Sequence, residues 1–171
     1  MTFTGSRKLP FILQAQQSEC ALACLAMVLN FHGHHTDINS LRQWLGSNRQ
    51  GMTLTTVMQL ADRLQLCARP LRLELTDLPK LQMPALLHWD MNHFVVLEKV
   101  RGNAVTLHDP AQGRVQYTLK EASLHFTGIA LELQPGAGFV TRDDRRRLHL
   151  RDLWTRSVGL GGSFVQLLLL S

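Results

Sequence analysis

The fold is decided by the stretch Gln14-Ala-Gln-Gln-Ser-Glu-Cys-Ala-Leu-Ala-Cys-Leu-Ala-Met27. Ser18 and Glu19 precede apolar residues at positions 22, 25, 26 and 29, which is the spacing of a helix with one buried face. This stretch therefore predicts a helix that carries Cys20 in its first turn. Unpaired backbone N–H groups and the positive end of the helix dipole lie there, and both favour a thiolate over a thiol.

Two more helices are predicted before residue 66. One begins at Asp37 or Asn39 and buries Leu41 and Leu45. The next begins at Thr53, and its buried side chains are Leu54, Val57, Ala61 and Leu64.

From Cys67 onward the pattern changes to short runs that alternate or are rich in β-branched residues. The predicted strands cover residues 71–75, 85–89, 93–100, 104–109, 115–117 and 129–133. Thr118-Leu-Lys-Glu121 has the sequence of a capping box and predicts one brief helix through Phe126. Helices followed by such strands predict an α+β fold, with the N-terminal helices packed on an antiparallel sheet.

The composition indicates one globular domain without a disulfide framework. Of the 171 residues, 45% are hydrophobic, which is enough for a core. Cys20, Cys24 and Cys67 lack the spacing of disulfide or zinc sites and indicate thiols in a reducing compartment. We interpret Cys24 and Cys67 as small apolar side chains.

The net charge of +5 is concentrated in arginines of residues 142–156, and only 6% of residues are aromatic, so no nucleic-acid partner is expected.

The domain organisation follows from turn formers and charge. Residues 134–138 mark the end of the folded domain, and six arginines precede an apolar run that begins near Val158. The expected units are an N-terminal extension (1–8), the domain (9–139), a basic linker (140–156) and the start of a truncated transmembrane helix (157–171). An interfacial amphipathic tail is the alternative for the last unit. Arginines before a membrane span place the preceding domain in the cytoplasm, and Met1 to Pro10 lack the apolar core of a signal peptide.

Among eight histidines, His88 and His93 lie at the end and the start of neighbouring predicted strands. Taken alone, His93 is more typical of a core or edge position than of a catalyst. The cluster at positions 32, 34 and 35 could bind a metal, but a turn between helices is the favoured interpretation.

Three motifs in order resemble one family. They are the stretch from Gln14 to Met27, Leu87-His-Trp-Asp-Met-Asn-His-Phe-Val-Val-Leu97, and Leu107-His-Asp-Pro-Ala-Gln-Gly113. His93 follows Cys20 by 73 positions and Asp109 follows His93 by 16. The stretch from about Leu9 to Phe139 resembles the papain-like cysteine peptidase domain of bacteriocin-processing ABC transporters, the double-glycine peptidases.

The resemblance implies a role for each matching residue. Cys20 would be the nucleophile, His93 the general base and then acid, and Asp109 the carboxylate that orients the imidazole. Gln14 would line the oxyanion hole together with the Cys20 backbone N–H. The family usually has glycine after the nucleophile, whereas this chain has Ala21. The sequence therefore does not determine the exact shape of the substrate channel.

The resemblance also implies a function: removal of the double-glycine leader from a ribosomally made bacteriocin or microcin precursor, coupled to export. The alternative is a leader-tethering domain that does not cleave. The expected partners are the leader peptide and the transmembrane and nucleotide-binding domains of the same transporter, which is homodimeric at full length. The expected location is the cytoplasmic face of the bacterial inner membrane.

No cofactor or metal is expected in this domain. Residues 159–162 contain three glycines but lack the lysine and Ser/Thr pair of a phosphate-binding loop, so ATP is expected only in the nucleotide-binding domain. A dependence on calcium is left open.

Overall fold

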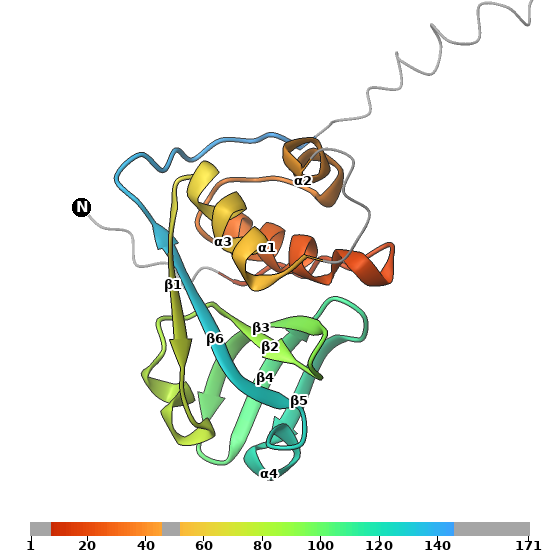
Figure 1. Ribbon diagram of the computed structural model, residues 1–171, viewed down its shortest axis with the longest axis vertical. Coiled ribbons are helices and arrows are strands. Elements are labelled where there is room, and N and C mark those ends of the chain that lie inside the picture. Colours follow the sequence, from red (N-terminus) through yellow and green to blue (C-terminus); the bar gives the residue numbers. More distant parts are fainter. Residues whose placement is uncertain (1–7, 46–51, 146–171) are drawn as a thin grey trace, which may run out of the picture.

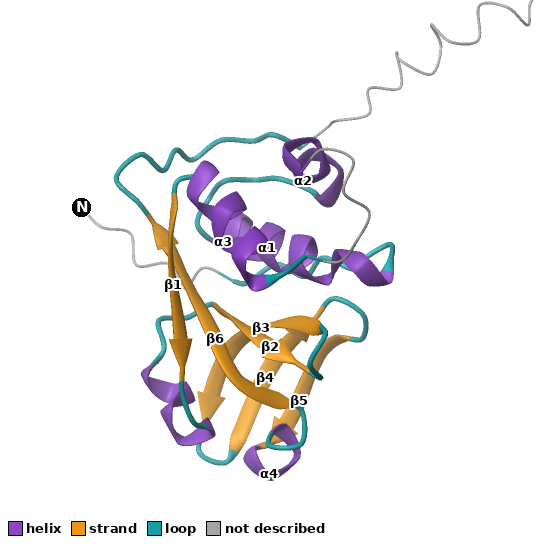
Figure 2. Cartoon of the chain, in the orientation of Figure 1, coloured by secondary structure: helices purple, strands orange, loops and turns teal. Residues whose placement is uncertain are grey.

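The computed structural model describes residues 8–45 and 52–145. In these residues a layer of helices lies against one side of an antiparallel sheet, as Figure 1 and Figure 2 show. The helical layer contains α1 (Cys20–Phe31), α2 (Ile38–Leu45) and α3 (Leu54–Arg63), and a 3-10 turn, η1 (Gln17–Glu19), leads into α1. The predicted α+β fold is confirmed.

Helix α1 lies at the centre of the molecule. Every residue from Cys20 to Leu29 is buried, because the helix contacts α2, α3 and strand β3. The expectation of a single buried face was therefore too narrow. A helix that is apolar on all sides belongs in a core, and this one positions its N-terminus against the sheet.

The other two helices begin at residues that cap them. Asp37 accepts a hydrogen bond from the Ser40 backbone N–H at 2.7 Å, and α2 starts at the next residue. Thr53 accepts a hydrogen bond from the Thr56 backbone N–H at 3.2 Å and caps α3. Leu41 is buried as expected, while the side chain of Leu45 lies outside the described residues.

Within the described residues the sheet has six antiparallel strands in the order β1-β6-β2-β3-β4-β5. The strands are β1 (Leu66–Arg72), β2 (Ala85–Trp89), β3 (His93–Arg101), β4 (Ala104–Asp109), β5 (Gly113–Thr118) and β6 (Phe126–Pro135). One apolar cluster fills the space between this sheet and α1. A second cluster contains Leu78 of the 3-10 helix η2 (Leu75–Lys80) and Ala122 of the short helix α4 (Leu119–Ala122).

Four predicted segments were wrong in extent: the strands expected at 115–117 and 129–133 are longer and cover Gly113–Thr118 and Phe126–Pro135, and two others differ more in position or type. The strand expected at 71–75 is Leu66–Arg72, and the 3-10 helix η2 follows it. Pro70 is tolerated in β1 because this strand lies at the sheet edge. The helix expected to reach Phe126 is a single turn, α4, and Phe126 already begins β6. The capping box at Thr118 is present, with the Glu121 carboxylate accepting the Thr118 N–H at 2.7 Å.

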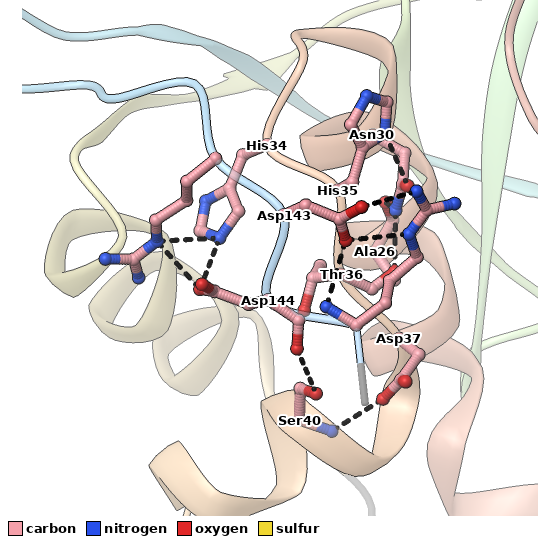
Figure 3. A network of polar contacts seen from close by, with 11 residues as sticks. Ala26, Asn30, His34, His35, Thr36, Asp37, Ser40, Asp143 and Asp144 are labelled. Atoms are coloured by element: carbon pink, nitrogen blue, oxygen red, sulfur yellow. Dashed lines mark hydrogen bonds and ion pairs between the residues drawn. The ribbon is translucent and has the colours of Figure 1, made fainter. Parts of the chain in front are cut away.

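The first residues of the predicted basic linker lie against the helical layer (Figure 3). The His35 backbone N–H donates to the Arg142 carbonyl, and the Asp144 N–H donates to the His35 carbonyl, both at 2.7 Å. The Asp144 carboxylate lies 2.9 Å from His34 Nε2 and 2.7 Å from Arg142 Nε, while the Ser40 hydroxyl donates to the Asp144 carbonyl at 3.0 Å. This network accounts for the polar contacts of His34.

Residues 146–171 lie outside the described residues, and with them most of the predicted linker and the whole predicted transmembrane segment. In the ranges 8–45 and 52–145 we find no helix that combines the length and apolar character needed to cross a membrane.

Candidate active site

Three secondary-structure ends bring the predicted catalytic residues together. Cys20 is the first residue of α1, His93 is the first of β3, and Asp109 is the last of β4. Strands β3 and β4 are neighbours in the sheet, and α1 packs on β3. The Cys20 residue is 5% exposed, the His93 side chain 17% and the Asp109 side chain 2%, so the group lies at the margin of the core.

Asp109 is held in place by two hydrogen bonds to one oxygen. Its Oδ1 lies 2.8 Å from His93 Nε2 and accepts the Ala111 backbone N–H at 2.8 Å. Burial raises the pKa of this carboxyl, but the bonds from His93 and Ala111 outweigh burial and leave the pKa below its usual value. Asp109 is therefore a carboxylate at neutral pH and directs His93 Nδ1 away from itself.

The imidazole of His93 lies between the carboxylate and the thiol. Burial lowers the pKa of His93, but the hydrogen bonds to Asp109 and Cys20, with the charges of both groups, raise it from 6.5 to about 9. The ring is thus an imidazolium at neutral pH. A protonated imidazole next to a cysteine favours the thiolate, which is the nucleophilic form.

Gln14 lies beside the turn that follows Asp109, because its backbone N–H donates to the Pro110 carbonyl at 3.0 Å. Its side-chain Oε1 is buried and has no hydrogen-bond partner among the described residues. A buried amide oxygen without a protein partner is uncommon, but this oxygen is an acceptor, whereas an oxyanion hole requires the N–H donor of the same amide. The oxyanion role of Gln14 stays a prediction.

The remaining cysteines stay outside this arrangement. The Cys24 thiol is fully buried and donates to the Phe94 carbonyl at 3.2 Å. Burial, followed by the charges of Cys20 and Asp109, raises its pKa well above the usual value. Cys67 is exposed in β1 at the far edge of the sheet.

Ala21, the residue after Cys20, is fully buried, so its methyl group packs inside the protein and does not face solvent.

Sequence reasoning missed the role of Glu19. Its buried carboxylate accepts the backbone N–H groups of Ala15 at 3.2 Å and Gln16 at 3.1 Å, and it forms an ion pair with Arg42 of α2. Glu19 thereby ties the segment that carries Gln14 to the start of α1. The signal in the sequence is a glutamate three residues after Gln16, the position of the acidic residue in a capping box.

A thiol at a helix N-terminus, an imidazole on a facing strand and a carboxylate on the next strand define a papain-like cysteine peptidase. The chain belongs to the peptidase C39 family, whose model matches residues 8–138. The predicted family and the cysteine peptidase class are thereby confirmed.

Two curated relatives from Escherichia coli are named as secretion and processing proteins. The chain is 41% identical over 165 residues to the probable microcin-H47 secretion/processing ATP-binding protein MchF, and 39% identical over 165 residues to the colicin V secretion/processing ATP-binding protein CvaB. Each alignment covers 96% of this chain and 24% of the relative, so the chain spans about a quarter of their length.

A solved structure with similar sequence is that of a double glycine motif protease from an AMS/PCAT transporter in complex with the leader peptide. It is 35% identical, its TM-score is 0.70, and the alignment covers 78% of this chain and 96% of that one. The peptidase domain of Streptococcus ComA has the same fold, with a TM-score of 0.68 at 24% identity.

Proposed function

We propose that this domain cuts a ribosomally made bacteriocin or microcin precursor after a double-glycine pair and so removes its leader. The observation that carries the proposal is the His93–Asp109 hydrogen bond of 2.8 Å with Cys20 next to the same imidazole. The similar protease with a bound leader peptide and the two secretion and processing relatives support the choice of substrate.

The geometry suits acyl transfer in two steps. The Cys20 sulfur attacks the carbonyl carbon of the second glycine, and the oxyanion that forms is stabilised by the Cys20 backbone N–H and the Gln14 amide. His93 then protonates the leaving amine, which releases the mature peptide and leaves the leader as a thioester. His93 next takes a proton from water, and the hydroxide that forms attacks the thioester carbon. The C–S bond breaks, the leader leaves with a new carboxyl group, and the Cys20 thiolate again lies beside a protonated His93. These steps use only groups of this chain, the peptide and water.

Replacement of Gln14 tests the oxyanion hole. We expect Gln14→Ala to lower kcat by about 10² to 10³, the usual loss for one oxyanion donor, because that donor acts mainly in the transition state. KM should change little. The matched control is Gln17→Ala, since Gln17 is an exposed glutamine in the same segment. Steady-state cleavage of a synthetic precursor measures both, and equal kcat values for the two variants would remove Gln14 from the mechanism.

The competing hypothesis is a domain that binds a leader without cutting it. It is disfavoured because a tether has no need for an imidazole that is hydrogen-bonded to a carboxylate and lies next to a thiol. Incubation of the domain with a double-glycine precursor separates the two, because only the peptidase yields two products of the expected masses.

Specificity for glycine tests the function most directly. Glycine has no side chain to bind, so discrimination must come from a channel too narrow for a Cβ before the scissile bond. Valine in place of the glycine next to the cut should therefore suppress kcat far more than binding. Alanine in place of leader leucines should mainly raise KM, because such residues bind away from the reacting bond. Equal cleavage of the valine and glycine peptides would contradict a double-glycine peptidase.

We also propose that the domain acts at the cytoplasmic face of the inner membrane, as the N-terminal part of a homodimeric exporter. The support is the match to one quarter of two ATP-binding secretion proteins, together with the arginine-rich residues 142–156. ATP is then bound by the nucleotide-binding domain of that exporter, and cleavage itself needs no cofactor in this domain.

A further inference from the structure

The turn between β2 and β3 has an unfavourable backbone conformation. Asp90 has φ 48° and Met91 has φ 65°, and neither residue is glycine. A Cβ disfavours this left-handed region, and Met91 lacks even the short polar side chain that makes the region tolerable for aspartate. Such a conformation persists only where neighbouring groups hold it.

His125 supplies the contacts that hold this turn. Its carbonyl accepts the Asp90 backbone N–H at 2.9 Å, and its Nδ1 lies 2.7 Å from Asp90 Oδ1. Its ring stacks on Trp89, with 5.4 Å between centroids and an angle of 11° between planes. His125 is itself fixed after α4, because its backbone N–H donates to the Ala122 carbonyl at 3.2 Å. One residue thus restrains both the last residue of β2 and the first of the turn.

The turn is directly coupled to the proposed catalytic histidine. Trp89 pairs with His93 in the β2–β3 register, so only residues 90–92 connect the two. A connection this short has no spare length, so a change in the backbone conformation of Asp90 or Met91 would move the start of β3. His93 stands at that start and must keep both its bond to Asp109 and its contact with Cys20, which tolerate displacements of only a fraction of an ångström.

We propose that His125 is a positioning residue for His93, and that it acts by holding the β2–β3 turn in its left-handed conformation. His125 contacts neither Cys20 nor Asp109 through any hydrogen bond that the structure shows, so its effect passes through the backbone. The inference rests on the cysteine peptidase site of the proposed function but not on the identity of the peptide. A role in stability alone would change the melting temperature and leave the chemistry of the folded protein intact.

A pair of substitutions at Asp90 separates the two roles. Asp90→Ala and Asp90→Gly both remove the bond to His125 Nδ1, but only alanine keeps a Cβ at the positive φ. The Asp90 side chain is 51% exposed, so both variants should fold. The readout is the rate at which iodoacetamide alkylates Cys20 at pH 7, which follows the thiolate next to His93. We expect Asp90→Ala to react about tenfold more slowly than the unchanged protein and Asp90→Gly within about twofold of it.

A second set of variants starts from the histidine. His125→Phe keeps the ring on Trp89 and removes the bond to Asp90, so Cys20 should again alkylate about tenfold more slowly. Adding Met91→Gly removes the conformational cost at position 91, which lacks the polar side chain that makes a positive φ tolerable at Asp90, and should restore most of the rate. His35→Phe is the control, because His35 is an exposed histidine bound to Asn30 in the helical layer. Peptide mapping of fully buried Cys24 reports any unfolding, since it reacts only when the core opens.

The result that overturns the proposal is equal alkylation of Cys20 in Asp90→Ala and Asp90→Gly, or a double variant no faster than His125→Phe. Cleavage assays add a second readout, in which His125→Phe lowers kcat and leaves KM unchanged. If the unchanged protein cuts no double-glycine precursor, the proposed function fails, whereas the alkylation rates still decide the role of His125 because they require no peptide.

Discussion

The Cys20→Ala protein is expected to bind a leader peptide and leave it uncut. Removing the nucleophile of a catalytic triad costs about 10⁶ in kcat, because the covalent path is lost and only binding and the oxyanion hole remain. Cys20 is a small residue at the start of α1, so alanine there should disturb the helix little. Mass spectrometry of the products and fluorescence anisotropy of a labelled leader measure cleavage and binding separately.

Cys24→Ala is the matched control. Cys24 lies one helical turn further along α1, and its thiol is buried on the Phe94 carbonyl. Its loss should cost about 1 kcal/mol of stability, the usual value of one hydrogen bond, and leave cleavage at the level of the unchanged domain. Cleavage that survives in Cys20→Ala, or disappears in a folded Cys24→Ala protein, would assign the nucleophile to another residue.

Predictions from the sequence were most accurate where the controlling forces are local. The helix start at Cys20, the Thr53 cap and the capping box at Thr118 depend on residues within one turn of one another. The extent of β1 could not be predicted in this way. Its partner β6 lies about sixty residues further along the chain, and the pairing of Leu66 with Pro135 sets where the strand begins.

In the candidate site, too, features set by neighbouring residues could be predicted, and features set by distant partners could not. The resemblance of three ordered motifs to one family singled out Cys20, His93 and Asp109, and the structure places each of them at the end of a secondary-structure element. Glu19 carried only a local capping-box signal, and His125 carried none. Their partners Arg42 and Asp90 are 23 and 35 positions away, and a sequence does not show which distant residues meet. The contacts through which these two residues support the site are therefore visible only in the folded chain.

Asp109→Asn is expected to lower kcat roughly 10⁴-fold, the loss seen when an amide replaces a triad aspartate, because the amide no longer stabilises the imidazolium or fixes its orientation. It should also move the pH profile. The pKa of His93 is raised from 6.5 to about 9, so the imidazolium persists up to that pH in the unchanged protein. Without the carboxylate this pKa falls, and the alkaline limb of kcat/KM moves to lower pH.

The pKa of His93 should also determine how the stability difference between the unchanged protein and Asp109→Asn depends on pH. A pKa raised on folding contributes stability that is complete below the unfolded value of 6.5 and is lost as the pH rises through about 9. The difference in melting temperature between the unchanged protein and Asp109→Asn should therefore be largest near pH 6 and shrink between pH 6.5 and 9. A difference that stays constant over this range would mean that Asp109 supports the fold without holding the charge of His93, and the carboxylate would then have no part in forming the nucleophile.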